Sequence, residues 1–565
     1  MFNTILIAFF IFLNSSAISA QTIVRTSEEL KRLLTEDCEQ GNILLDGDIF
    51  QLSGAEVKAG GRIKPYPGRK PVLIGFHQKV EKGNRKIDEE GYWTVPIKSY
   101  GYSQIVFLDE NLEAIPYSCH INGKDGFDVK AKQIETIKKE QRIVRTLIPS
   151  GFEYLKNKEK PFFKNFSIKM GYWFVGITLN QIYSDDTYLY GCIDNAYNLD
   201  LLSNRPNSNV HLEFFNLPKE GNGIFLDGND VLHVKREFEE VRVCTTPALM
   251  KLVGDRELYF ENITFSGANT ITIDVQGSNK HFKNCVIRNC GSGIEASNGC
   301  YSDCSVENCL IENLYDNRAI QLRNVNNVLI KGNTIRHTGT LMKGGSVISV
   351  GGLNFSVSSN NISDFSYNAI SAGITRDYKS GTMSGIISEN VVDNAANWGK
   401  AENQLTDGGG IYVLTHTDGV VIENNIVRNI GYEGCELWGI YLDDGAYNCT
   451  VRRNLVYSLW PGQYAMTSRY VDECEHSCMN NIFEGNIFIG PCKMAGNRNG
   501  FGNKTIIRNN YIAGEMNTQG DEYVSLEGNK FISATIGKDG RIVSGKGERI
   551  KKRGYTCGIK KLIKR

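Results

Sequence analysis

The chain has 565 residues, with 63 Lys and Arg against 63 Asp and Glu, and with 58 Gly but only 12 Pro. This length exceeds what one hydrophobic core usually supports, so more than one domain is expected. The balanced charge gives no global indication of a nucleic-acid partner or an anionic membrane surface, and the abundance of Gly favours many short strands joined by tight turns over a helical fold.

Residues 1–20 have the pattern of a targeting segment. An apolar run from Ile5 to Leu13 is followed by small residues up to Ala20. The run is too short to span a bilayer, which predicts a cleaved signal peptide and a secreted or periplasmic protein. No Lys or Arg precedes the run, so an uncleaved anchor is the alternative; no later stretch is long and apolar enough for a membrane span.

The 15 cysteines are an odd number, so at least one is expected to stay unpaired within the chain. The spacings of Cys300 to Cys304 and of Cys474 to Cys478 resemble metal-ligand spacings. Structural thiols or a few disulfides are nevertheless the favoured interpretation, because other cysteines fall at a repeat position described below.

Residues 21–84 are expected to form an N-terminal cap and the first strands of a stacked sheet. Ser27 is the predicted N-cap of a short helix with Leu30, Leu33 and Leu34 on one face. Residues 85–250 are richer in Lys, Tyr and Phe and show alternating strands without a short repeat. They predict an inserted β-rich, sandwich-like domain.

Residues 251–535 carry a repeat in which Asn, or Cys in the first two copies, stands between two apolar strands. The marker falls at 285, 309, 333, 360, 390, 425, 454, 486 and 510. Steps of this size, lengthened by insertions in the middle, predict an all-β protein built as a parallel β-helix. Stacked Asn side chains predict a hydrogen-bonded ladder, with Cys285 and Cys309 as small buried fillers. Residues 536–565 read as a basic C-terminal tail or cap.

A second strand recurs in each coil, and the residue after its inward Ile or Met is expected to face outward. The first outward row reads Asp274, Glu295, Gln321, Ser349, Ser371, Tyr412, Tyr441 and Thr467. A second row, two residues further along each strand, includes Arg323, Asp443 and Arg469. A face of acids, amides, hydroxyls and aromatic rings suits a sugar ligand.

Residues 407–445 contain two copies of one phrase, Gly-Gly-Ile-Tyr ending at Tyr412 and Trp-Gly-Ile-Tyr ending at Tyr441. The copies are in register, which aligns Asp407 with Glu436 on neighbouring coils. Glycosidic bond cleavage commonly uses two carboxyl groups that lie roughly 5 to 9.5 Å apart. Asp407 and Asp443 stand at opposite ends of equivalent strands, about 20 Å apart along the strand direction. The two can act as a pair only if the chain bends at the glycines after Asp407.

Asp407, Asp443 and Glu436 are therefore the candidate catalytic residues. Asp443 aligns with Arg469 on the next coil and is the predicted base or nucleophile, with Asp407 or Glu436 as proton donor. The candidate substrate-binding residues are Asp444, Tyr412, Tyr441, His416, Trp438, Arg469, Arg323 and Glu295. No cofactor is expected, although clustered acids are also the ligands that Ca²⁺ prefers.

The chain resembles secreted bacterial right-handed β-helix proteins related to glycoside hydrolase families 120 and 141. The likeness rests on the Asn-rich repeats, the β-rich insertion, and above all DGGGIY followed by WGIYLDDG. It implies a right-handed, pectate-lyase-like solenoid and a glycosidase acting on plant cell-wall glycans. It also implies Asp407 as one catalytic carboxyl and Asp443, Glu436 or Asp444 as the other.

The favoured hypothesis is a secreted glycoside hydrolase acting on a polysaccharide or oligosaccharide, without a nucleic-acid partner or a membrane span. A polysaccharide lyase is the first alternative, since Arg323, Arg469 and His416 could neutralise a uronate or act as a base. A non-catalytic glycan-binding or adhesin solenoid is the second. The sugar, its linkage, and retention or inversion of configuration stay open at this level.

Overall fold

The structure is a computed structural model. It describes residues 21–89, 91–97, 105–115, 120–121, 127–130, 165–170, 173–182, 189–192, 209–216, 224–226, 231–296, 299–342, 345–373, 383–395, 408–414, 417–432, 437–443, 446–470, 476–498, 504–519, 521–536 and 542–544. The predicted signal peptide, residues 1–20, lies outside these ranges.

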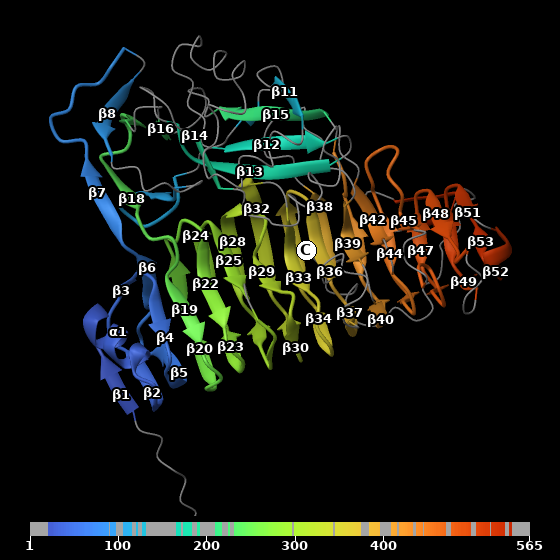
Figure 1. Cartoon of the computed structure of the whole chain (residues 1–565), viewed down its shortest axis with the longest axis horizontal. Coiled ribbons are helices and arrows are strands. Elements are labelled where there is room, and N and C mark those ends of the chain that lie inside the picture. The colour runs from blue at the N-terminus through green and yellow to red at the C-terminus, as the bar shows by residue number, and fades with distance from the viewer. Residues whose placement is uncertain are drawn as a thin grey trace, which may run out of the picture.

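Three long parallel sheets run the length of the protein, and each coil of the chain adds one strand to each sheet (Figure 1). Apolar residues from the inner faces of all three sheets form one continuous buried cluster, from Val24 to Val524. The predicted parallel β-helix is thereby confirmed. Its strands are short because only an alternating stretch of apolar residues is needed to line the interior.

Sheet A has 14 strands among the described residues. In stacking order they are β1 (Gln21–Val24), β2 (Glu39–Leu45), β5 (Gly60–Pro65), β20 (Leu258–Glu261), β23 (Lys280–Lys283), β27 (Ser305–Glu307), β31 (Leu329–Lys331), β34 (Phe355–Ser358), β37 (Met383–Ser388), β40 (Thr417–Glu423), β43 (Thr450–Arg452), β46 (Ile482–Glu484), β49 (Thr505–Arg508) and β52 (Val524–Glu527).

Sheet B has 13 described strands. They are β3 (Ile49–Leu52), β6 (Val72–Gly75), β21 (Thr264–Ser266), β24 (Val286–Cys290), β28 (Leu310–Asp316), β32 (Thr334–Met342), β35 (Asn361–Phe365), β38 (Val391–Ala395), β41 (Ile426–Arg428), β44 (Leu455–Tyr457), β47 (Ile487–Ile489), β50 (Tyr511–Ala513) and β53 (Lys530–Phe531).

Sheet C has 12 described strands and carries the predicted outward rows. They are β4 (Ala55–Val57), β19 (Met250–Val253), β22 (Ile271–Gln276), β25 (Ser292–Glu295), β29 (Ile320–Leu322), β33 (Ser346–Val350), β36 (Asn368–Gly373), β39 (Gly408–Leu414), β42 (Leu437–Leu442), β45 (Met466–Ser468), β48 (Cys492–Ala495) and β51 (Met516–Gln519). Two short pairs lie outside the three sheets, β26 (Tyr301–Ser302) with β30 (Val325–Asn326), and β54 (Ala534–Ile536) with β55 (Ile542–Ser544). A 3₁₀ turn, η1 (Asp521–Tyr523), precedes β52.

The bend between sheets A and B explains the repeat marker. The residue before each marker has a left-handed backbone, as at Asn308 (φ 53°), Gly332 (φ 70°) and Asn424 (φ 57°). Asn and Gly are the residues that adopt this conformation at least cost. The chain therefore turns sharply there and places the marker side chain inside the stack.

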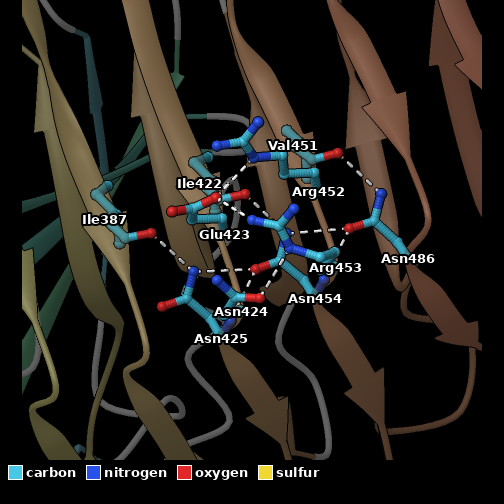
Figure 2. Close-up of polar contacts among 10 residues, drawn as sticks. All are labelled: Ile387, Ile422, Glu423, Asn424, Asn425, Val451, Arg452, Arg453, Asn454 and Asn486. Carbon is cyan, nitrogen blue, oxygen red and sulfur yellow. Dashed lines mark hydrogen bonds and ion pairs between the residues drawn. The ribbon is translucent and has the colours of Figure 1, made fainter. Parts of the chain in front are cut away.

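The marker residues form the predicted Asn ladder. Each side-chain amide donates to the next marker's Oδ1 at 2.9–3.0 Å, from Asn333 through to a further rung at Asn529. Figure 2 shows the same amides donating to the carbonyls of Ile387, Ile422 and Val451, each at 2.9 Å. Outside the ladder, Glu423 accepts from Arg452 and Arg453 at 2.6 Å, which ties the surfaces of two coils together.

Cys285 and Cys309 occupy the two ladder positions that precede Asn333 and are buried free thiols. The backbone N–H of Cys309 donates to Asn333 Oδ1 at 2.8 Å, and the two thiols donate to carbonyls of the preceding coils. The prediction that they are buried fillers is confirmed. The position before Cys285 in the stack is the buried Ile263, so no side-chain amide precedes the two thiols.

The predicted helix is α1 (Ser27–Thr35), with Leu30, Leu33 and Leu34 buried. Its N-cap is Thr26 rather than Ser27, so the predicted cap was wrong by one residue. The Thr26 hydroxyl accepts from the N–H of Glu29, and the Glu29 carboxylate accepts from the N–H of Thr26. This reciprocal pair outweighs Ser27, which instead accepts from the N–H of Gln51 at 2.8 Å.

Between β6 and β19 the chain leaves the solenoid and forms antiparallel strands. They are β7 (His77–Glu81), β8 (Tyr92–Pro96), β9 (Phe107–Leu108), β10 (His120–Ile121), β11 (Phe127–Lys130), β12 (Asn165–Met170), β13 (Trp173–Ile182), β14 (Leu189–Cys192), β15 (Asn209–Asn216), β16 (Ile224–Leu226), β17 (Val231–Lys235) and β18 (Glu240–Cys244). The predicted β-rich insertion is thus present, and Figure 1 shows β12, β13 and β15 beside the solenoid.

The base of the insertion is fastened to the solenoid by a buried asparagine and by a more exposed ion pair. Asn269 accepts from the N–H of Val106 at 2.8 Å and donates to the carbonyl of Cys244 at 2.7 Å. Arg288 of β24 pairs with Glu113 at 2.8 Å. The antiparallel ribbon of β7 and β18 therefore leaves and rejoins the solenoid at one fixed place.

Candidate active site

The outer face of sheet C is the expected row of polar side chains. Strand register pairs its members one coil at a time, in the order Asp274, Glu295, Gln321, Ser349, Ser371, Tyr412, Tyr441 and Thr467. Most of these residues are less than 9% exposed, and Ser371 is partly exposed. The row is therefore largely covered instead of lying open along the surface.

The repeated phrase places its glycines where no side chain fits. A Cβ on Gly410 would lie 2.6 Å from the Val427 side chain, and a Cβ on Gly439 would lie 2.4 Å from the Val456 side chain. Both glycines thus bring sheet C close against sheet B. The following tyrosines, Tyr412 and Tyr441, then lie side by side on the outer face, with ring centroids 5.1 Å apart.

Asp443, directly after β42, is the centre of this part of the row. Tyr412 donates to its Oδ2 at 2.7 Å, and Tyr441 donates to its Oδ1 at 2.6 Å. Its own N–H donates to the carbonyl of Val413 at 2.8 Å. The side chain has no exposed surface. Two hydroxyl donors, one for each oxygen, suit an ionised carboxylate, which is an acceptor only.

Arg469 lies on the next coil, as its alignment with Asp443 predicted. Its Nη1 is 3.9 Å from Asp443 Oδ1, and its side chain is half exposed. At this distance the guanidinium contributes charge but no short hydrogen bond. Trp438 packs edge-on against Tyr441, with ring centroids 4.4 Å apart, and is itself partly exposed.

Four of the predicted site residues, Asp407, Glu436, Asp444 and His416, lie outside the described ranges. The residues that follow the first two in the chain, Gly408 and Leu437, pair with each other across neighbouring coils. Within the described ranges, no group of three or more His, Cys, Asp or Glu side chains is placed to hold a metal ion. The Ca²⁺ hypothesis, which rests on the clustered acids of 407–445, stays a prediction.

Glu295 and Arg323 belong to a different part of the row. Five strand spacings of ~4.8 Å separate Glu295 from Tyr441, or ~24 Å in all. Arg323 is exposed, whereas Glu295 is buried. The predicted binding residues therefore form two separate groups, and only a ligand of several sugar units could contact both.

Glu295 is surrounded by residues that the sequence did not single out. Ser292 Oγ donates to its Oε1 at 2.5 Å, and Arg318 lies 3.3 Å from its Oε2 while also binding Asp316 at 2.7 Å. Burial raises the pKa of the Glu295 carboxyl, against the opposing influence of Arg318 and Ser292. Asp316 ends β28 and Arg318 lies in the turn after it, both outside the two rows, so the repeat contained no signal for them.

The comparison with protein-family models agrees with the fold. A family model described as "Right handed beta helix region" matches residues 251–439. A structure titled "Glycoside hydrolase" is similar with 12% identity, covering 89% of this chain and 90% of that one, at a TM-score of 0.44. XylC in complex with xylose is similar with 13% identity, covering 88% and 70%, at a TM-score of 0.33.

A mannuronic-acid-specific polysaccharide family 6 lyase from human gut microbiota has 12% identity, covering 52% of this chain and 80% of that one, at a TM-score of 0.27. No curated protein matches the sequence. Likeness at this level supports no argument about activity. The protein is a right-handed parallel β-helix, as the resemblance implied.

Proposed function

We propose that this protein is a carbohydrate-active enzyme that hydrolyses glycosidic bonds at the Asp443 end of the sheet C row. The single observation that carries the proposal is the buried Asp443 carboxylate, held by Tyr412 and Tyr441 with Arg469 beside it. Burying a carboxylate costs free energy that its hydrogen bonds offset, and groups held at such a cost cluster at functional sites.

In this mechanism Asp443 is the proton-accepting carboxylate. Its two phenol donors fix its orientation, and the Arg469 guanidinium lies 3.9 Å from its Oδ1. The proton donor is Asp407 or Glu436, since the pairing of Gly408 with Leu437 supports the predicted register of the two acids on adjacent coils. Trp438, which is partly exposed and packs against Tyr441, offers apolar surface to a sugar ring. Asp444 and His416 remain proposed substrate contacts.

The proposed substrate is a plant cell-wall or related polysaccharide or oligosaccharide. Support for an extended ligand comes from the groups along sheet C that are open to solvent, namely the partly exposed Trp438 and Ser371 and the exposed Arg323 next to β29. Secretion, predicted from residues 1–20, is part of the proposal. No helix among the described residues has the length and apolar character that a membrane crossing requires.

A polysaccharide lyase is the second candidate function. It is favoured by Arg469 beside the tyrosines and by the exposed Arg323, since a guanidinium can neutralise a uronate carboxylate during β-elimination. Lyase action creates an unsaturated sugar end that absorbs ultraviolet light, and hydrolysis does not.

The test is incubation of the purified protein with plant cell-wall polysaccharides and with uronate polymers. Release of reducing ends without an increase in ultraviolet absorbance supports hydrolysis. An increase in ultraviolet absorbance, caused by the unsaturated sugar end, supports the lyase. Binding without either product, unchanged in D407N and D443N, would support the adhesin and overturn the enzymatic proposal.

A further inference from the structure

The described side chains near Asp443 that are most open to solvent lie on the coils that follow it. Arg469, on the next coil, and Arg498, on the coil after that, are exposed. On the preceding side, the row members Ser371 and Leu414 are only partly exposed. A ligand beside Asp443 is therefore expected to extend over β45 and β48, which Figure 1 shows in succession after β42.

Lys493 places a further cation on these coils. Strand register pairs Tyr441 with Thr467 and Thr467 with Lys493, so Lys493 stands on the first outward row. Two strand spacings of ~4.8 Å, or ~10 Å in all, separate it from Tyr441. Its side chain is partly exposed, so it can contact a ligand that lies along the row.

Arg498 lies against the residue next to Arg469. Its guanidinium carbon is 5.5 Å from the centre of the Tyr470 ring, which is a cation–π contact. Arg469 Nη1 is in turn 3.9 Å from Asp443 Oδ1. The positive charges therefore begin beside the buried carboxylate and continue over the two following coils.

Lys493 and Arg498 are not neutralised by acids among the described residues. Neither forms an ion pair within the described ranges. The described acids on this part of sheet C are the buried Asp443 and Glu515, which stands just before β51. A solvent-open face with an excess of positive charge attracts anions.

Aromatic rings lie on the same coils as the cations. Trp438 packs edge-on against Tyr441, and its ring centroid is 6.5 Å from that of Tyr464. Trp438 and Tyr464 are partly exposed, and Trp460, in the turn before β45, is 43% exposed. Exposed ring faces offer apolar surface to a sugar. The rings distinguish this part of sheet C from a general basic surface.

We propose that the coils of β45 and β48 form a subsite for an anionic sugar unit, with Lys493 and Arg498 binding its charged group. This inference rests on the proposed function and names the class of substrate, a glycan that carries carboxylate or sulfate groups. A guanidinium binds an oxyanion by paired hydrogen bonds, and a lysine ammonium adds a point charge. Trp438 and Tyr464 hold the sugar rings.

Binding to matched glycan fragments tests the inference. The probes are oligogalacturonates beside their methyl esters, glucurono-xylo-oligosaccharides beside plain xylo-oligosaccharides, and sulfated galactan oligosaccharides beside their desulfated forms. The measurement is Kd by isothermal titration calorimetry on the full-length protein. We expect the charged member of at least one pair to bind about tenfold more tightly, the scale of two screened ionic contacts. The pair concerned identifies carboxylate or sulfate as the anion.

The chain offers matched variants. Lys493→Gln and Arg498→Gln should each raise Kd for the charged oligosaccharide by about fivefold and leave Kd for its uncharged counterpart unchanged. Lys251→Gln is the control and should change neither Kd. Lys251 stands on the same row at its opposite end, where it pairs in register with Asp274. Thermal melts check that each variant is folded.

Salt provides a second measurement. Raising its concentration from about 0.01 M to about 1 M shortens the screening length from about 30 Å to about 3 Å, so only the charged member should bind more weakly.

Equal affinity for both members of every pair, no binding of any charged oligosaccharide, or equal changes in K251Q and K493Q would overturn the inference, even in a protein that hydrolyses neutral glycans. A wild type that prefers a charged glycan through Lys493 and Arg498 but releases no reducing ends would instead overturn the proposed hydrolysis and leave the subsite in place.

Discussion

The Asn ladder and the outer row of sheet C are both stacks of one side chain per coil, but their composition follows opposite rules. The ladder repeats one residue from Asn333 to Asn529, and every amide is bonded to the next. The row changes residue type at almost every coil, from Asp274 to Thr467. The ladder residues hydrogen-bond to one another, whereas the residues of the row each need a partner of a different kind.

This difference separates stability from function within one repeat. Because the ladder amides bond to one another, each added coil is stabilised in the same way, and no coil is given a property of its own. In the row, carboxyl groups are buried with different partners: Asp443 with two phenols, and Glu295 with Ser292 and Arg318. Changes in the ladder should therefore affect stability alone, and changes in the row should affect activity at one end.

Asp443→Asn should break the row at its catalytic end and is expected to have the largest effect. The amide cannot accept a proton, so kcat should fall by about 10²–10⁴-fold while the melting temperature changes little. The measurement is the initial rate of sugar release. Asp393→Asn, which removes a carboxylate paired with Arg428 on sheet B, should keep full activity; equal losses in both variants would contradict the assignment.

Asn360→Ala should break the ladder. Asn360 is 1% exposed, donates to Ile330 and Asn390, and accepts from Asn333, so its loss leaves buried groups unpaired. We expect a loss of about 3 kcal/mol in the free energy of unfolding, measured by urea, with unchanged kcat in the folded protein. The next residue, Asn361, is exposed, and Asn361→Ala should cost less than about 0.5 kcal/mol. Similar costs at both positions would refute the ladder's role.

Arg469→Gln should weaken the catalytic end without destroying it. The guanidinium is half exposed and 3.9 Å from Asp443 Oδ1, so solvent screens much of its charge. A reduction of about tenfold or less in kcat/KM is expected. Arg452→Gln, which removes a comparable guanidinium paired with Glu423 on sheet A, is the control. A loss as large as that of D443N would show that Arg469 contacts the reacting atoms.

Glu295→Gln, at the opposite end of the row, should change how the free energy of unfolding depends on pH. This is the smallest of the expected effects. Burial raises the pKa of Glu295, so the folded state holds its proton to a higher pH than the unfolded chain does. Between the two pKa values the free energy of unfolding falls as pH rises. E295Q lacks this loss, so its free energy of unfolding should rise relative to that of the wild type as pH increases from about 4 to about 7.

The control for this pH dependence has the opposite sign. Hydrogen bonding from Arg69 lowers the pKa of Asp46, so the stability that Asp46 contributes is present above its unfolded pKa and is lost as pH falls. Asp46→Asn should therefore cost more at about pH 7 than at about pH 4. The measurement for both is urea unfolding at the two pH values; parallel trends in D46N and E295Q would contradict the burial of Glu295.

Much of the site followed from register. The spacing of Tyr412 and Tyr441 relative to the markers placed them on adjacent rungs, and Asp443 follows Tyr441 by two residues on the same face. A tyrosine and carboxylate cluster could have been inferred from these facts. The burial of this cluster could not have been inferred, because it depends on which side chains cover the row. The partners of Glu295 were missed because Asp316 ends a strand of sheet B and Arg318 lies in the turn after it, and the periodicity of sheet C predicts the direction of neither side chain.

The sequence by itself determined the solenoid, because the marker after each left-handed bend, an Asn from Asn333 onward, is satisfied by the same residue one coil away, and that requirement is local and periodic. Only the tertiary structure decided how Asp443 is held. Its bond to Tyr412 joins residues 31 positions apart, and its complete burial results from the packing of several coils. These contacts occur at one coil only, so the repeat in the sequence does not predict them.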